Sequence, residues 1–282
     1  MTHRYSLAYL TVPGLNPPDM VDVAARTGYS YVGLRLNRTT PEEPHYPLIS
    51  DAELRRATKQ RLQATGIGVW DLEVARLWPE TELEDYREFL ETGAELGALH
   101  VIAQLQDPDL SRASERFGQL CVLAAGLGIG VDLEFIAWSQ VPDLATAASI
   151  LRTVDQPNAG ILVDMLHFQI AGSTLAELRS LPGRWFRYVH LCDAPSLTAD
   201  NTEELFRVMR HERRFPGDGV IDIRGVLGCL DPDVVCALEI PGDTMASQVG
   251  LDQYARLALS ATEDYLAGRR SPIREQEEEK TR

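Results

Sequence analysis

Three carboxylates and one imidazole each stand near the end of a short apolar run in the second half of the chain. They are Glu134, Asp164, His190 and Glu239, separated by about one strand and one helix. Any one of them alone could be a salt-bridge partner or a core histidine, but the same position in four successive runs favours one shared site. Converging carboxylates repel one another, which a bound metal or shared protons would resolve. This donor set suits one Mn²⁺, Mg²⁺ or Co²⁺ better than a thiolate-rich zinc site, and Mn²⁺ is our first prediction.

These side chains converge only if the chain builds a suitable frame, and an alternation of segments predicts one. Eight apolar or β-branched runs are the expected strands: Tyr5–Leu10, Tyr31–Leu36, Gly68–Val74, Leu99–Gln104, Gly130–Phe135, Gly160–Asp164, Phe186–Cys192 and Val234–Ile240. Stretches with helical periodicity follow them: Pro17–Thr27, Asp51–Thr65, Glu82–Leu96, Leu110–Leu127, Pro142–Val154, Thr174–Ser180, Thr202–Arg213 and Leu251–Leu266. Eight such units predict a single α/β domain, a (β/α)8 TIM barrel whose strands end at one mouth.

The alternative frame, an open doubly wound sheet, is disfavoured by the position of the glycines. Such a sheet usually carries a glycine-rich phosphate turn after its first strand. The one glycine cluster, Gly126–Gly130, instead follows an expected helix and precedes an expected strand. It is therefore interpreted as a helix end and a tight turn, not as a nucleotide-binding motif.

Composition limits the class of protein. The 282 residues carry a formal net charge of −15, which argues against nucleic acid as a partner. The sequence shows neither a signal peptide nor a long apolar span, so we expect a soluble, cytoplasmic protein without a membrane partner. Four cysteines without zinc-ribbon spacing are expected to be reduced and mostly buried. No composition break divides residues 1–268, whereas residues 269–282 are expected to form a disordered, charged tail.

Other polar residues near strand ends have two open interpretations. Glu73 ends the third expected strand and would either bind a substrate hydroxyl or form a salt bridge with Arg35 or Arg76. Gln104, on the fourth strand, is equally open. Asp193, three residues after His190, is a candidate for orienting the metal site.

Five short motifs resemble a known family. Leu-Glu-Phe, Val-Asp-Met-Leu-His, Val-His-Leu-Cys-Asp-Ala, Arg-Phe-Pro-Gly-Asp-Gly-Val-Ile-Asp and Leu-Glu-Ile are similar to motifs of the sugar phosphate isomerase/epimerase group of the xylose isomerase-like TIM-barrel superfamily. The resemblance extends from Tyr5 to about Leu266 and is most specific in the second half. It implies a xylose isomerase-like barrel, and a homo-oligomer is a family-level expectation.

The resemblance also implies roles for individual residues. Glu134, Asp164, His190 and Glu239 would hold one divalent cation, and Glu134 and Glu239 would be the catalytic acid/base pair on opposite sides of the substrate. His167 and Arg214 match positions that contact substrate oxygens. No lysine cluster or glycine-rich cradle marks a phosphate site, so Arg214, with Arg213, Arg38 and Arg35 in reserve, would instead pair with a carboxylate.

The chemistry agrees with these roles. Removing a proton next to a carbonyl requires a base near the carbon and a cation near the oxygen that gains negative charge. We therefore predict a metal-dependent isomerase or epimerase of a small, polyhydroxylated hydroxy-ketone. Two alternatives stay open: a lyase such as the 3-dehydroshikimate dehydratases of this superfamily, and a non-catalytic sugar-binding barrel. A DNA-repair role is disfavoured because the chain has only six histidines and a strongly negative charge.

Overall fold

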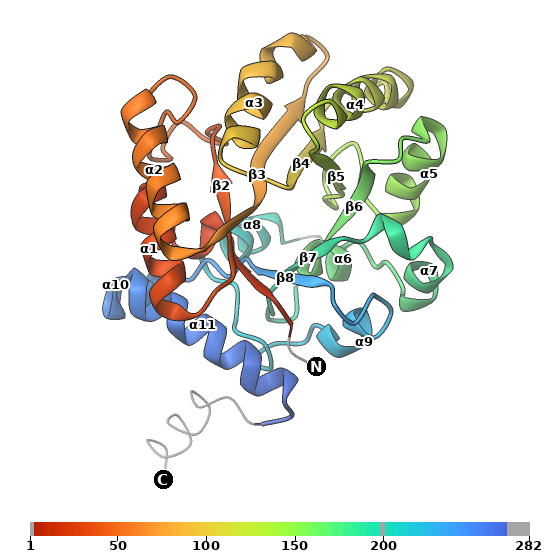
Figure 1. The fold of residues 1–282 in the computed structure, drawn as a ribbon. Coiled ribbons are helices and arrows are strands. Elements are labelled where there is room, and N and C mark those ends of the chain that lie inside the picture. The colour runs from red at the N-terminus through yellow and green to blue at the C-terminus, as the bar shows by residue number, and fades with distance from the viewer. Residues whose placement is uncertain (1–2, 198–200, 270–282) are drawn as a thin grey trace.

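A closed ring of eight parallel strands forms the centre of the molecule (Figure 1). The computed structural model describes residues 3–197 and 201–269. The strands follow the order of the sequence: β1 Tyr5–Leu7, β2 Tyr31–Arg35, β3 Gly68–Leu77, β4 His100–Leu105, β5 Gly130–Glu134, β6 Ala159–Asp164, β7 Tyr188–Leu191 and β8 Val235–Leu238. The predicted (β/α)8 barrel is confirmed. Most of the predicted tail, residues 270–282, lies outside the described part of the chain.

Helices surround this ring (Figure 1). They are α1 Pro17–Thr27, α2 Ala52–Thr65, α3 Arg87–Glu95, α4 Leu110–Ala125, α5 Leu144–Val154, α6 Met165–Ile170, α7 Leu175–Ser180, α8 Thr202–His211, α9 Ile223–Leu227, α10 Asp243–Val249 and α11 Leu251–Leu266. Local chemistry sets their ends. For example, the Asn16 side chain accepts a hydrogen bond from the Asp19 amide at the start of α1, and Gly28 ends that helix with a φ of 102°.

The predicted segments agree with the structure, with local differences. Pro17–Thr27 and Leu251–Leu266 have the predicted bounds. The predicted helix Glu82–Leu96 is divided into a 3₁₀ turn, Leu83–Tyr86, and α3. Three short helices, α6, α9 and α10, were not predicted, because each is shorter than the window over which helical periodicity becomes visible.

Alternation along the strands divides the apolar residues into two groups. One set packs between strands and helices as the main core, and includes Val101, Val163 and Leu191. A second cluster fills the inside of the barrel: Trp70, Val74, Ile102, Leu162, Tyr188, Val235 and Ala237. Because the interior is packed, polar side chains that follow these residues along the strands must lie at the mouth.

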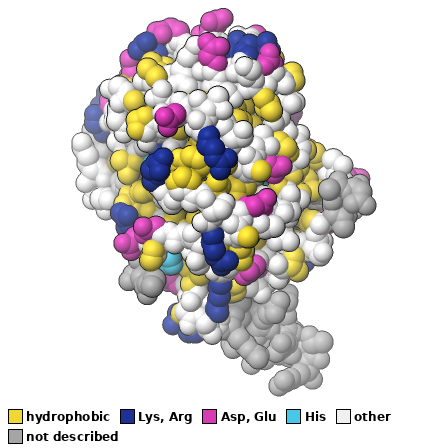
Figure 2. Space-filling model, turned by 90° about the vertical axis from the view of Figure 1, so that its right-hand side faces the viewer, with side chains coloured by type: hydrophobic (Ala, Val, Ile, Leu, Met, Phe, Trp, Pro, Cys, Tyr) yellow, Lys and Arg dark blue, Asp and Glu magenta, His cyan; other side chains and the backbone are white. Residues whose placement is uncertain are grey.

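The outer surface mixes polar and apolar side chains. On the face shown in Figure 2, acidic and basic groups alternate around exposed hydrophobic side chains near the centre. Among the described helices, none is both long and apolar enough to span a bilayer. All four cysteines are free thiols; Cys121, Cys192 and Cys236 are buried and Cys229 is partly exposed.

Candidate active site

The carboxyl ends of β5 to β8 bring the four predicted ligand residues to one mouth of the barrel. Asp164 is the register partner of His190, and the Glu239 amide donates to the Leu191 carbonyl just after β8. Glu134 is the last residue of β5. All four side chains are buried, with exposed fractions of 7% or less. The strand-end argument therefore placed these residues correctly, although they are far apart in sequence.

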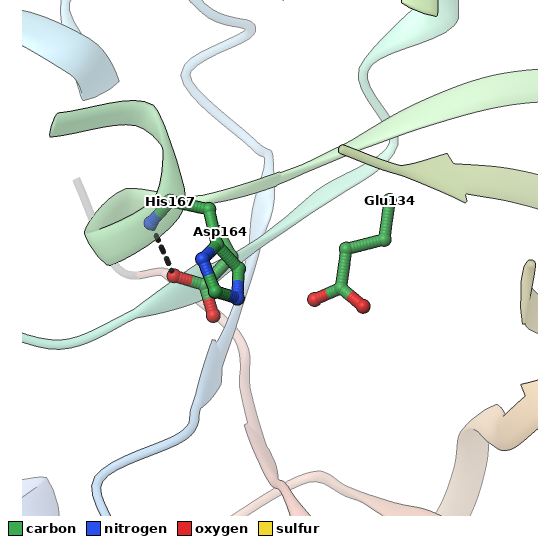
Figure 3. A group of neighbouring side chains, drawn as sticks. All are labelled: Glu134, Asp164 and His167. Atoms are coloured by element: carbon green, nitrogen blue, oxygen red, sulfur yellow. Dashed lines mark hydrogen bonds between the residues drawn. The ribbon is translucent and has the colours of Figure 1, made fainter. Parts of the chain in front are cut away.

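Two overlapping sets of donor atoms have the spacing of a metal site. The ligand atoms of Glu134, Asp164 and His167 lie within 4.8 Å of one another, as do those of Asp164, His190 and Glu239. Figure 3 shows the Glu134 carboxylate facing Asp164 and the His167 ring. Both ring nitrogens of His190 are buried; Nδ1 lies 3.3 Å from Glu239 Oε2, and Nε2 has no hydrogen-bond partner. An unpartnered buried nitrogen beside three carboxylates fits a divalent cation.

Asp164 has a second role that links the strand to the next helix. Its Oδ1 atom accepts hydrogen bonds from the Leu166 and His167 amides, at 2.7 and 3.2 Å, and so caps α6; Figure 3 shows the second of these bonds. The capped turn carries the His167 side chain into the cavity, where its Nδ1 atom is buried without a partner. The Trp138 ring lies against it, with ring centroids 5.1 Å apart. This geometry leaves His167 positioned to bind a polar ligand atom.

Arg213, rather than the predicted Arg214, belongs to this site. Its guanidinium donates to Asp164 Oδ2 at 2.7 Å and contacts Glu239 Oε2 at 2.9 Å. Arg214 is exposed, and its Nη1 atom donates to the Asp218 carbonyl. Arg214 is not among the residues that line the cavity, so its contact with substrate stays a prediction. Residues 213 and 214 are adjacent in an extended segment, so their side chains point to opposite sides, and the motif alone could not say which one faces the mouth.

Asp193 holds the loop that follows Arg213. Its carboxylate accepts hydrogen bonds from the Gly217, Gly219 and Ile221 amides at 2.9 to 3.0 Å. Its backbone also pairs with that of Arg214. Asp193 thus fixes the segment that presents Arg213, rather than touching the candidate ligands as the sequence had suggested.

Electrostatics separate the two predicted catalytic carboxylates. Burial raises the pKa of Glu134 to about 7, helped by the charges of Glu239 and Asp164 and opposed by His190. Burial alone would raise the pKa of Glu239 too, but His190 and Arg213 outweigh it and hold the pKa well below its usual value. Such a separation is typical of acid/base pairs. The pKa of His167 is lowered by burial, which favours the neutral ring.

The opposite wall of the mouth, from β2, β3 and the loop after β2, is built from ion pairs. Glu73 Oε2 accepts from Arg35 at 2.5 Å, and its Oε1 accepts from the Tyr9 amide at 3.2 Å. Arg35 also donates to Glu43 at 2.8 Å. The salt-bridge interpretation of Glu73 is therefore the one the structure contains. Gln104 connects the two walls, because it accepts from Arg76 at 2.9 Å and donates to Glu134 at 2.5 Å.

These groups line a cavity of about 170 Å³. Helix α8 lies over this end of the barrel, behind the strands in Figure 1, and supplies Phe206, Met209 and Arg210 to the lining. Trp138 completes this side, with its ring centroid 5.2 Å from that of Phe206. A cavity of this size, with buried polar groups at its floor and aromatic rings at its rim, fits a small hydroxylated molecule.

The site can be compared with known proteins. A family model described as xylose isomerase-like TIM barrel matches residues 21–262. A 3-dehydroshikimate dehydratase of Pseudomonas aeruginosa is 34% identical over 39% of this chain and 17% of its own length. An inosose isomerase of Bacillus licheniformis is 28% identical over 52% of this chain and 55% of its own length. The chain thus spans at most about half the length of these two curated relatives.

Solved structures share the whole fold. The IolI protein with a bound zinc atom superposes with a TM-score of 0.77 at 19% identity, covering 94% of this chain and 98% of its own. At this identity the likeness concerns the fold. The relatives named above are enzymes, an isomerase and a dehydratase.

Proposed function

Because the chain belongs to the xylose isomerase-like TIM barrel family, we propose that it is a divalent-metal-dependent isomerase or epimerase of a small, polyhydroxylated hydroxy-ketone. The observation that carries this proposal is geometric: Glu134 and Glu239 are two buried carboxylates that line one cavity, beside the donor atoms of Asp164 and His190. A carboxylate positioned beside the reacting carbon can remove a proton next to a carbonyl and return it.

Glu134, Asp164, His190 and Glu239 would hold one divalent cation, with Mn²⁺ first and Mg²⁺ or Co²⁺ next. Their oxygen-rich donor set and the unpartnered Nε2 atom of His190 support this assignment. A bound cation would stabilise negative charge on the substrate oxygen during proton transfer. His190 must be neutral to act as a ligand, so metal binding would displace its proton.

The chain's own groups would handle the proton. Glu134 takes it from the carbon on one face, and the Gln104 amide keeps the carboxylate oriented by its hydrogen bond. Glu239, held in place by Arg213 and His190, lies beside the other face as the second acid/base group. Return of the proton from the opposite side inverts the carbon, and return to the neighbouring carbon isomerises the ketone. His167 and Arg213 would bind substrate oxygens.

A second candidate, a lyase of a hydroxylated oxo-acid, is favoured by one specific observation. The arginines of the cavity wall outnumber the carboxylates beside them, which suits an acidic substrate. The match to a 3-dehydroshikimate dehydratase supports the same candidate. The cytoplasmic location, homo-oligomeric state and absence of a nucleic-acid partner remain predictions.

Proton exchange from D₂O into a panel of ketoses, inososes and hydroxylated oxo-acids tests the proposal. Protein loaded with Mn²⁺, Mg²⁺ or Co²⁺ should exchange a carbon-bound proton of at least one compound. Glu134→Gln and Glu239→Gln should lose exchange while keeping the fold, and Glu115→Gln on the exposed surface of α4 is the matched control. Ligand binding without exchange at any metal loading would instead favour a non-catalytic sugar-binding barrel.

A further inference from the structure

One wall of the cavity carries more positive than negative charge. Three arginines line it, Arg35, Arg76 and Arg210, and the two carboxylates beside them are Glu43 and Glu73. The side chains come from β2, β3, the loop after β2 and α8. Whether a positive charge is left for a ligand depends on how these five groups are paired.

Both carboxylates are committed to Arg35. Its Nη2 atom lies 2.5 Å from Glu73 Oε2, and its Nη1 atom lies 2.8 Å from Glu43 Oε1. The second oxygen of each carboxylate is occupied as well: Glu73 Oε1 accepts from the Tyr9 amide at 3.2 Å, and Glu43 Oε2 accepts from the Thr39 amide at 2.8 Å. The charge of Arg35 is therefore neutralised within the wall, and this side chain has a structural role.

Neither Arg76 nor Arg210 has a carboxylate partner as close as those of Arg35. Arg76 donates to two neutral oxygens, Gln104 Oε1 at 2.9 Å and the Thr39 carbonyl at 3.0 Å, and makes no ion pair within residues 3–197 and 201–269. Arg210 approaches one carboxylate, Glu43, at 3.6 Å, too far for a good hydrogen bond. Burial, together with the charges of Arg35 and Arg210, lowers the pKa of Arg76, and the charges of Glu134 and Glu43 oppose this shift without cancelling it.

We infer that Arg76 and Arg210 form a subsite for a carboxylate of the substrate, so that the substrate is a hydroxylated oxo-acid rather than a neutral sugar. The inference deepens the proposed function and rests on it. Guanidinium groups bind carboxylates with paired, charge-assisted hydrogen bonds. One excess positive charge matches a carboxylate better than a phosphate ester, which carries nearly two negative charges at neutral pH.

The position of this subsite is consistent with chemistry at Glu134. Arg76 and Glu134 are joined through a single side chain, Gln104, which accepts from the first and donates to the second. A carboxylate held at Arg76 would thus lie about one side chain away from the proposed base. The anion would anchor one end of the substrate while the reacting carbon reaches Glu134.

A matched pair of cyclic hydroxy-ketones separates the carboxylate from the rest of the substrate. 3-Dehydroshikimate carries a carboxylate and inosose does not, and a phosphorylated ketose, fructose 6-phosphate, serves as the phosphate probe. We would measure the Kd of each by calorimetry for Mn²⁺-loaded wild type, Arg76→Gln, Arg210→Gln and the control Arg179→Gln, an exposed residue of α7 that does not line the cavity. Circular dichroism and melting confirm that each variant is folded.

We expect 3-dehydroshikimate to bind the wild type more tightly than inosose, and each cavity variant to weaken it about tenfold or more. Inosose binding and the control should change less than twofold. The inference is overturned if both cavity variants bind 3-dehydroshikimate like the wild type, if the wild type does not bind it, or if the phosphate ester binds more tightly in an arginine-dependent way.

Proton exchange measured on the same samples distinguishes this inference from the proposed function. Arginine-dependent binding of 3-dehydroshikimate without exchange into any compound would contradict the proposed function and support the subsite. Exchange into inosose that is unchanged in Arg76→Gln and Arg210→Gln, with no preference for the carboxylate, would contradict the subsite and support the proposed function.

Discussion

At the mouth of the barrel, the wall from β5 to β8 and the wall from β2 and β3 use similar residue types in different ways. Around Arg35, two carboxylates and one guanidinium satisfy one another. Around Asp164, by contrast, three carboxylates lie beside one guanidinium and His190, whose Nε2 atom is buried without a hydrogen bond. A satisfied group holds the fold, whereas an unsatisfied one is available to a ligand. The wall from β2 and β3 is therefore mainly structural at Arg35, whereas the wall from β5 to β8 has donor atoms left for a ligand.

The largest expected effect is at Asp164. Asparagine can still cap α6 but removes the charge of a proposed ligand, so Asp164→Asn should lose bound metal and lower turnover by about a thousandfold or more. Elemental analysis and the exchange assay measure the two losses. The exposed Asp233→Asn is the matched control. Full metal content in Asp164→Asn would remove the distinction between the two walls.

A substitution at Glu73 should lower stability and leave the metal content unchanged. Glu73→Gln leaves Arg35 with only Glu43, and breaking a buried ion pair by removing one partner costs about 3–5 kcal/mol of unfolding free energy. Glu43→Gln should cost less, because the Glu43 side chain is 12% exposed and that of Glu73 only 1%. Denaturant unfolding measures both. Bound metal should be unchanged, and its loss in Glu73→Gln would mean that this wall also serves the metal.

Asp71, below Glu73 on β3, gives a pH-dependent test. Burial, together with the charge of Glu73, raises the pKa of Asp71 well above its usual value, and neither oxygen has a hydrogen-bond partner. The pKa of Asp71 is higher in the folded chain than in the unfolded chain, so protonation of this carboxyl favours folding. This contribution to the free energy of unfolding is complete below about pH 4 and is lost as pH rises towards the folded pKa.

Asp71→Asn should therefore gain stability relative to the wild type as pH rises from about 4, by up to about 1.4 kcal/mol per pH unit until the folded pKa is reached. Urea unfolding at several pH values between about 4.5 and 8 measures this slope. Any constant effect of the buried amide cancels in the comparison. A difference that does not vary with pH would show that Asp71 is not protonated in the folded chain.

The sequence predicted the wall from β5 to β8 better than the wall from β2 and β3, for a physical reason. Glu134, Asp164 and His190 stand at fixed positions on successive strands, so the period of the barrel alone brings them together. The pairing of Arg35 with Glu43 instead depends on the path of the loop after β2, which has no periodic pattern. The sequence left Glu73 open for that reason, since it named both a salt bridge and a substrate contact.

The two adjacent arginines, Arg213 and Arg214, also show that a sequence pattern does not give the path of a loop. A substitution at Arg214 has the smallest expected effect. The motif marked Arg214, but the pairing of its backbone with Asp193 turns Arg213 inward and leaves Arg214 outside. Arg214→Gln should change turnover less than twofold and unfolding free energy by less than about 0.5 kcal/mol. Arg213→Gln, which leaves Asp164 and Glu239 without their guanidinium, should lower turnover strongly in the same assay. If Arg214→Gln proved the more damaging of the two, the loop would have to present Arg214 rather than Arg213 to the substrate. The positive charge beside Asp164 and Glu239 in the wall from β5 to β8 would then come from a different residue.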